Sequence, residues 1–161
     1  MALFIPRMHL FEIDDQPWFP PFLRVIVQAI LAQTWSLNLL IPSRSPAQIA
    51  TSNLIQHLDS LASLRFVDFC AGAGGPSPLI EQQVNTYLRN SNHEEVDFVL
   101  TDIHPNIDIW TRIASENPRI TYDGQSVDAS RVPERLVQSK DGRRLFRLFN
   151  LAFHHFDDNL A

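Results

Sequence analysis

The apolar residues of this chain follow one pattern before about residue 60 and another after it. Its longest apolar stretch, residues 22–41, is interrupted by Arg24, Gln28 and Asn38, which makes it too polar for a membrane span. Within it, apolar residues recur at spacings of three and four, which predicts an amphipathic or buried helix with one broad apolar face. That face consists of Val25, Ile26, Ala29, Ile30 and Leu31.

A second helix is predicted from about Pro46 to Ser60, after a proline-rich break at residues 42–46. Ser45 is placed to cap this helix, and Pro46 suits its first position because that position needs no amide donor. Its buried stripe comprises Ile49, Leu54, Ile55, Leu58 and Leu61. We interpret residues 1–61 as an N-terminal helical extension, or lid, to the rest of the chain.

From residue 62 onward, short apolar runs alternate with helical segments. The predicted order is strand 65–70, helix 77–89, strand 96–100, helix 106–116, strand 119–122, helix 132–139 and strand 144–152. Strict alternation predicts right-handed crossovers and a mainly parallel sheet. The fold class is therefore α/β, with helices added in front of a domain at residues 62–161.

Composition narrows the function classes. The chain has 161 residues, 45% of them hydrophobic, so it can build the core of one domain. Its net charge of -5, with no cluster of lysines and arginines, disfavours nucleic acid as a partner. A single cysteine, Cys70, excludes an internal disulfide and suits a reducing, cytoplasmic setting. Neither a membrane partner nor a bound metal is expected.

The loops that follow the predicted strands carry the candidate chemistry, because open α/β sheets bind ligands at the carboxyl ends of their strands. After the first strand, Gly72 and Gly74 allow positive φ and a close approach of the backbone to a ligand. Asp102, at the tip of the second strand, is placed like the acid that binds ribose hydroxyls. Asp128, after the third, could accept a hydrogen bond from an adenine amino group. Each of these features also suits an ordinary turn or helix cap.

Taken in this order, the loops make the chain resemble class I S-adenosylmethionine-dependent methyltransferases, in particular a fungal group acting on small molecules. The most specific segments are residues 67–76 (VDFCAGAGGP) and 149–158 (FNLAFHHFDD). Residues 1–7 and 14–19 are similar to that group as well, so the resemblance covers essentially the whole chain. It implies a Rossmann-like sheet and S-adenosyl-L-methionine as cofactor.

Carried over position by position, the resemblance implies a set of cofactor-binding residues. Asp68 and the glycine loop would hold the methionine part, Asp102 the ribose hydroxyls and Asp128 the adenine amine. Asn150 and the backbone after it would line the space beside the sulfonium. The full set is Asp68, Ala71, Gly72, Ala73, Gly74, Asp102, Ile103, Asp128, Ala129, Asn150, Leu151, Ala152 and Phe153.

The acceptor implied by the resemblance is a small molecule of the kind methylated in fungal secondary metabolism. Asn150 is followed by Leu-Ala-Phe and not by the Pro-Pro-Tyr associated with methylation of amino groups in DNA or protein glutamine. His154 and His155 are candidate general bases for an acceptor hydroxyl. The alternative for each histidine is a pocket-wall or structural role.

Three alternatives stay open. The family's sheet has seven strands and this sequence ends after the fourth, so we expect an incomplete sheet. The chain would then be a truncated fragment, or an inactive methyltransferase-like partner that forms a homo- or hetero-oligomer through the exposed sheet edge. An NAD(P)-dependent oxidoreductase is disfavoured by Ser77, which stands where a third glycine is expected. A metal hydrolase is disfavoured because adjacent histidines on an extended segment point in opposite directions.

Overall fold

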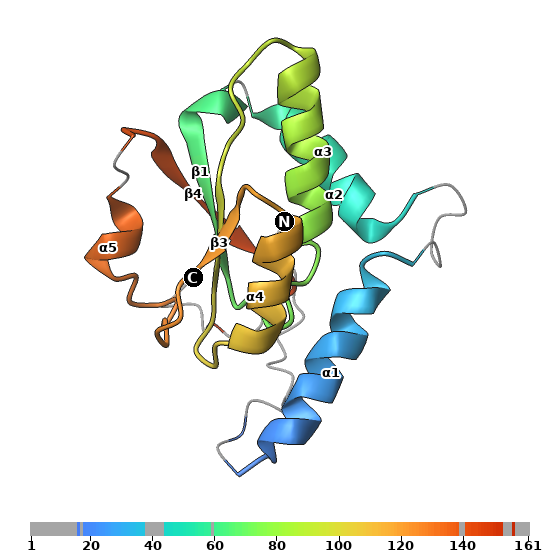
Figure 1. The fold of residues 1–161 in the computed structure, drawn as a ribbon, viewed down its shortest axis with the longest axis vertical. Helices are drawn as coiled ribbons and strands as arrows, with labels where there is room; N and C mark the ends of the chain where they lie inside the picture. The colour runs from blue at the N-terminus through green and yellow to red at the C-terminus, as the bar shows by residue number, and fades with distance from the viewer. Residues whose placement is uncertain are drawn as a thin grey trace, which may run out of the picture.

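The computed structural model describes residues 16, 18–37, 44–58, 60–138, 141–152 and 156. Its four strands are β1 (Leu64–Phe69), β2 (Phe98–Thr101), β3 (Ile120–Tyr122) and β4 (Arg144–Phe149). Its helices are α1 (Pro21–Thr34), α2 (Pro46–His57), α3 (Ser77–Asn90), α4 (Ile107–Glu116) and α5 (Glu134–Val137), with a short 3-10 turn at Leu61–Ser63. The predicted alternation of strand and helix is confirmed (Figure 1).

The sheet is parallel throughout, in the order β3-β2-β1-β4. The chain moves outward from β1 through β2 to β3, and then returns to place β4 on the other side of β1. Strand order therefore reverses between β1 and β4. This is the order of the first four strands of a Rossmann-type sheet. β4 is one of the two edge strands of the described sheet, β3 being the other, and the pairing of β4 with another chain stays a prediction.

Alternate strand residues point to opposite faces, so the sheet supports two cores. Phe66 and Phe98 stack at 4.6 Å between ring centroids on the face covered by α2, α3 and α4 (Figure 1). Trp110 of α4 is fully buried in this core. On the opposite face, Val67 and Phe69 pack with Leu136 of α5. The two central strands, β1 and β2, are consequently buried on both sides.

The boundaries of several elements differ from the prediction for local reasons. Ser45 caps α2 through a capping box with Gln48, as expected, but the helix ends at His57. β4 ends at Phe149 and not at residue 152, because Leu151 has a φ of 60°. β1 likewise excludes Cys70, whose φ is 63°. A residue in the left-handed region interrupts the extended backbone of a regular strand.

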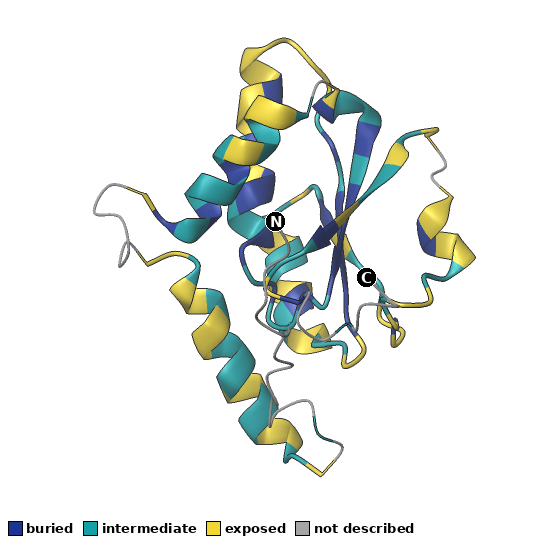
Figure 2. Ribbon diagram, turned by 180° about the vertical axis from the view of Figure 1, so that it is seen from behind, coloured by how far each residue is buried: buried dark blue, intermediate teal, exposed yellow. Residues whose placement is uncertain are grey.

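Helix α1 is the largest departure from the sequence interpretation. It ends at Thr34, and none of its residues is buried, so the alternative of a buried helix is wrong (Figure 2). The residues of its expected apolar face, apart from Ala29, are about half exposed: Val25, Ile26, Ile30 and Leu31. The reason is position, because α1 lies beside the carboxyl edge of the sheet and not against either face (Figure 1). No helix within the described ranges is long and apolar enough to cross a membrane.

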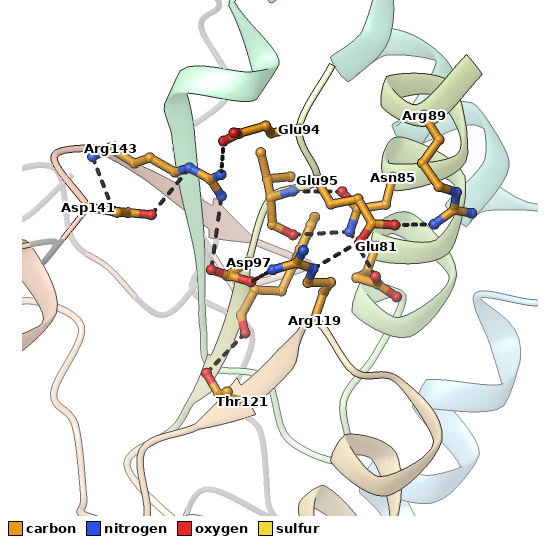
Figure 3. Close-up of polar contacts among 12 residues, drawn as sticks. Glu81, Asn85, Arg89, Glu94, Glu95, Asp97, Arg119, Thr121, Asp141 and Arg143 are labelled. Atoms are coloured by element: carbon orange, nitrogen blue, oxygen red, sulfur yellow. Dashed lines mark hydrogen bonds and ion pairs between the residues drawn. The ribbon is translucent and has the colours of Figure 1, made fainter. Parts of the chain in front are cut away.

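At the amino edge of the sheet, the buried side-chain amide of Asn85 bonds to the backbone just before β2. Asn85 of α3 donates to the carbonyl of Val96 and accepts from the Val96 amide, at 3.0 and 2.8 Å. The same side-chain nitrogen donates to the carboxylate of Glu81 at 2.8 Å (Figure 3). Asn85 and Val96 are both fully buried, so these bonds satisfy backbone groups that water does not reach.

Charge pairs continue along this amino edge (Figure 3). Arg119, immediately before β3, pairs with Glu95 at 3.0 Å and with Asp97 at 3.3 Å. Arg143, immediately before β4, pairs with Asp141 at 3.2 Å and approaches Asp97 at 3.9 Å. Each charge in the cluster therefore has an opposite charge within the protein.

Candidate functional site

A cavity of about 500 Å³ lies at the carboxyl edge of the sheet, where strand order reverses. Loops that follow all four strands contribute to it, together with one side of α1. Its lining comprises Gln28, Leu31, Ala32, Trp35, Cys70, Ala71, Gly72, Ala73, Gly75, Asp102, Ile103, His104, Val127, Asp128, Ala129, Asn150, Leu151, Ala152 and Phe156. Carboxyl-edge cavities at such a switch point are where α/β sheets bind their ligands.

The glycine loop after β1 is held at both backbone groups of Gly72. The Gly72 amide donates to the Asp102 carboxylate at 2.8 Å, and its carbonyl accepts from the indole of Trp110 at 2.9 Å. Gly72 has a φ of +52°, and a Cβ there would meet the Gln28 side chain at 3.5 Å. The loop is therefore positioned by the neighbouring strand and helix before any ligand arrives.

Asp102 stands at the tip of β2 and is 7% exposed. Its two carboxylate oxygens accept from the amides of Gly72 and His104, both at 2.8 Å. Asp102 also lines the cavity. The bond to His104 agrees with the turn interpretation of this residue, and its binding of a ribose stays a prediction.

Two non-glycine residues beside the cavity have strained backbones. Cys70 follows β1 and Leu151 follows β4, and both have φ near 60°. Bulky residues rarely adopt this conformation, and in proteins it concentrates at functional sites. Cys70 and Leu151 also line the cavity, and the two strands that they follow are those between which strand order reverses. The strained residues after β1 and β4 thus both belong to the cavity wall.

Asp68 lies beneath the cavity and not in its wall. It is 1% exposed, and its carboxyl accepts from the Ser77 hydroxyl at 2.5 Å and from the Asn150 amide at 3.1 Å. Burial raises the pKa of Asp68 to about 7, against the two hydrogen bonds, which lower it. A carboxyl at the end of a buried strand thus titrates near neutrality, and Asn150 connects it to the cavity.

Asp128 lines the outer part of the cavity from the segment after β3. It is exposed, and its Oδ1 accepts from the Ser130 amide at 2.9 Å and the Ser130 hydroxyl at 2.6 Å. These bonds lower the pKa of Asp128, so it is ionised. It is a turn-forming acid whose carboxylate also reaches the cavity.

Most of the residues predicted from the resemblance come together around this cavity. Ala71, Gly72, Ala73, Asp102, Ile103, Asp128, Ala129, Asn150, Leu151 and Ala152 all line it. Asp68 lies below the wall, and Gly74 packs against Ile113 of α4. Phe153 and the two candidate bases, His154 and His155, lie outside the described residues.

Helix α1 supplies a wall that the sequence analysis did not assign. Gln28, Leu31, Ala32 and Trp35 line the cavity, and the Asn106 amide donates to Gln28 at 3.2 Å. Their spacing of three, four and seven residues places them on one side of a helix. That spacing was visible in the sequence. Gln28, however, is polar, so the apolar pattern of the helix does not indicate it.

Comparison with protein-family models, with curated proteins and with solved structures finds no match for this chain. Any assignment of function therefore depends on the resemblance of the motifs and on the geometry of the cavity.

Proposed function

We propose that this chain binds S-adenosyl-L-methionine in the carboxyl-edge cavity and belongs to a class I methyltransferase that acts on a small-molecule acceptor. The observation that carries the proposal is the cavity at the reversal of strand order, walled in sequence by the loops after β1, β2, β3 and β4. Each of these loops contributes residues that the motif resemblance had assigned to the cofactor.

The residues present fit such a cofactor. The cavity volume of about 500 Å³ is within the usual range for small-molecule sites. Its wall offers carboxylates to hydroxyl and amino donors at Asp102 and Asp128, and a close backbone approach at Gly72. Apolar side chains of Ile103 and Leu31 provide surface for a ring.

Each wall residue then has a physical role. Asp102 accepts hydrogen bonds from vicinal hydroxyls while it holds the Gly72 amide in place. Asp128 accepts from an amino group, and Asn150 faces the cavity from the end of β4. S-adenosylmethionine, when bound, supplies a methyl group activated by its sulfonium. The protein contributes mainly by alignment, and His154 or His155 as general base stays a prediction.

The oxidoreductase alternative is not favoured by the structure. Ser77 occupies the position of the third glycine of the dinucleotide motif, is fully buried and donates to Asp68. A serine bonded beneath the loop has a structural role that a glycine cannot perform.

The test is calorimetric titration of the purified chain with S-adenosylhomocysteine, which needs no methyl acceptor. We expect binding, and Asp102→Asn should weaken it at least about tenfold, because hydrogen bonds to a charged group contribute roughly 1.5–3 kcal/mol. Glu116→Gln, at the far end of α4, is the matched control and should bind normally.

The outcomes separate the candidates. No binding of S-adenosylhomocysteine by the folded chain overturns the cofactor assignment, and a preference for NADH would favour the oxidoreductase. Equal affinities of wild type and Asp102→Asn would remove Asp102 from the site. Binding of S-adenosylmethionine without turnover of any acceptor would favour the inactive methyltransferase-like partner or fragment.

A further inference from the structure

Asn150 joins the cavity to a buried acid. It stands directly after β4 and lines the cavity, and its side-chain Nδ2 donates to Oδ1 of Asp68 at 3.1 Å. Within the described ranges, no residue donates a hydrogen bond to the side-chain oxygen, Oδ1, of Asn150. An amide whose nitrogen donates to the buried acid presents its oxygen, a hydrogen-bond acceptor, on the opposite side.

Among the described residues, two side chains donate to the Asp68 carboxyl. Ser77, at the start of α3, donates to Oδ2 at 2.5 Å, and Asn150 donates to Oδ1. Thr101 of β2 donates to the Asp68 backbone carbonyl and not to the carboxyl. Asp102 is the charged group that acts on Asp68, and it opposes ionisation.

We propose that Asp68 is a positioning residue whose protonation state sets which end of the Asn150 amide faces the cavity. When Asp68 is ionised, it accepts from Asn150 Nδ2 and the amide oxygen faces the cavity. When Asp68 takes a proton from solvent on Oδ1, that oxygen becomes a donor while Oδ2 still accepts from the Ser77 hydroxyl, and the amide turns over so that its oxygen accepts from Asp68. Its nitrogen then faces the cavity.

The turn of the Asn150 amide would change which ligands the cavity prefers near neutral pH, because burial places the pKa of Asp68 at about 7. An outward oxygen favours cationic or donor ligands, and an outward nitrogen favours acceptors. The consequence for ligands rests on the proposed function, which places Asn150 beside the sulfonium. The coupling between Asp68 and Asn150 does not depend on any ligand.

The coupling is tested on the ligand-free chain by nuclear magnetic resonance. The side-chain amide signal of Asn150, assigned by its loss in Asn150→Ser, is followed as pH is raised through neutrality. We expect it to shift with a midpoint near 7 in wild type and to stay constant in Asp68→Asn. Glu81→Gln is the matched control, because Glu81 is also a buried acid bonded to an asparagine amide, and should leave the midpoint unchanged.

A second variant keeps the test decisive if Asp68→Asn does not fold. Ser77→Ala removes a hydrogen bond that lowers the pKa of Asp68, so the midpoint should move to higher pH. A constant Asn150 signal in folded wild type overturns the proposal. A titration that persists in Asp68→Asn, or a midpoint unchanged by Ser77→Ala, overturns it as well.

Ligand binding then separates this proposal from the cofactor assignment. Calorimetry on the same samples compares S-adenosylmethionine, with its sulfonium charge, with the neutral thioether S-adenosylhomocysteine. We expect the affinity for S-adenosylmethionine, relative to that for S-adenosylhomocysteine, to rise about fivefold as pH is raised through the midpoint. In Asp68→Asn this ratio should not change with pH. Failure of both ligands to bind would refute the cofactor assignment, while the titration of Asn150 would still support the coupling.

Discussion

At the amino edge of the sheet, a buried asparagine has both ends of its amide bonded, whereas at the carboxyl edge a half-buried asparagine borders a cavity. Asn85 illustrates the first edge, with three hydrogen bonds to Glu81 and Val96. Asn150 illustrates the second, with one bond, to Asp68. Two asparagines bonded to buried acids thus have different freedom, because only one of them has both ends of its amide held by the described protein.

Positive φ occurs at both edges, at Asn92 and Gly142 before β2 and β4, and at Cys70, Gly72, Gly74, Gly75 and Leu151 after β1 and β4. Of these residues, only those in the loops after β1 and β4 border the cavity. At the amino edge, Arg119 and Arg143 precede their strands in ion pairs with neighbouring acids. The amino edge therefore contributes mainly stability, and the carboxyl edge retains strain and open space that a ligand can use. Substitutions at each edge in turn should therefore separate the contribution to stability from the contribution to ligand binding.

Asn85→Leu should give the largest loss of stability. The substitution leaves the Val96 amide and carbonyl buried without partners, which we expect to cost about 3–5 kcal/mol in the free energy of unfolding. Urea denaturation measures the change. Asn90→Leu, at the exposed end of the same helix, is the control and should cost little. A loss below about 1 kcal/mol for Asn85→Leu would show that the amino edge does not depend on this amide.

Asp68 should dominate the pH dependence of stability at the carboxyl edge. Its pKa is about 7 in the folded chain, against the ordinary 3.8 of an aspartate, so between these pH values the folded state holds a proton that the unfolded state releases. Stability should therefore fall as pH rises, by up to about 4 kcal/mol from this group.

Urea denaturation across this pH window measures whether the free energy of unfolding falls as pH rises. In Asp68→Asn the decline should flatten relative to wild type, whereas Glu116→Gln, at the exposed end of α4, should keep it. A steeper decline in Asp68→Asn than in wild type would show that the carboxyl is stabilised as its anion.

Arg119→Gln should have the smallest effect. The guanidinium pairs with Glu95 and Asp97, but its side chain is 43% exposed, so the pairs should contribute only about 0.5–1 kcal/mol. We expect a small loss in urea denaturation that disappears at high salt, with unchanged affinity for S-adenosylhomocysteine. A loss of affinity in this variant would mean that the two edges are coupled.

The sequence predicted the elements well because their signals are local. The alternation of strand and helix, the Ser45 cap and the glycine loop each depend on residues within a few positions of one another. The candidate site was largely predictable too, because the carboxyl ends of parallel strands meet at one edge. Asp102 and Asp128 reach one cavity for that reason.

Contacts between distant segments could not be predicted in the same way. Gln28 reaches the cavity beside Asn106, 78 positions later in the chain, only because α1 lies against that edge. The helical period shows which residues share a side, but not what that side meets. For this reason, of the two predicted alternatives for α1, an amphipathic or a buried helix, the buried one is wrong.

Asp68 shows which properties follow from the sequence and which follow only from the tertiary structure. By itself, the sequence determined that Asp68 shares a strand face with the buried Phe66, two residues earlier, since strand side chains alternate. Only the tertiary structure decided that Ser77 and Asn150 meet its carboxyl, the latter from 82 positions away. The physical reason is that strand order, set by packing of the whole sheet, places β4 beside β1.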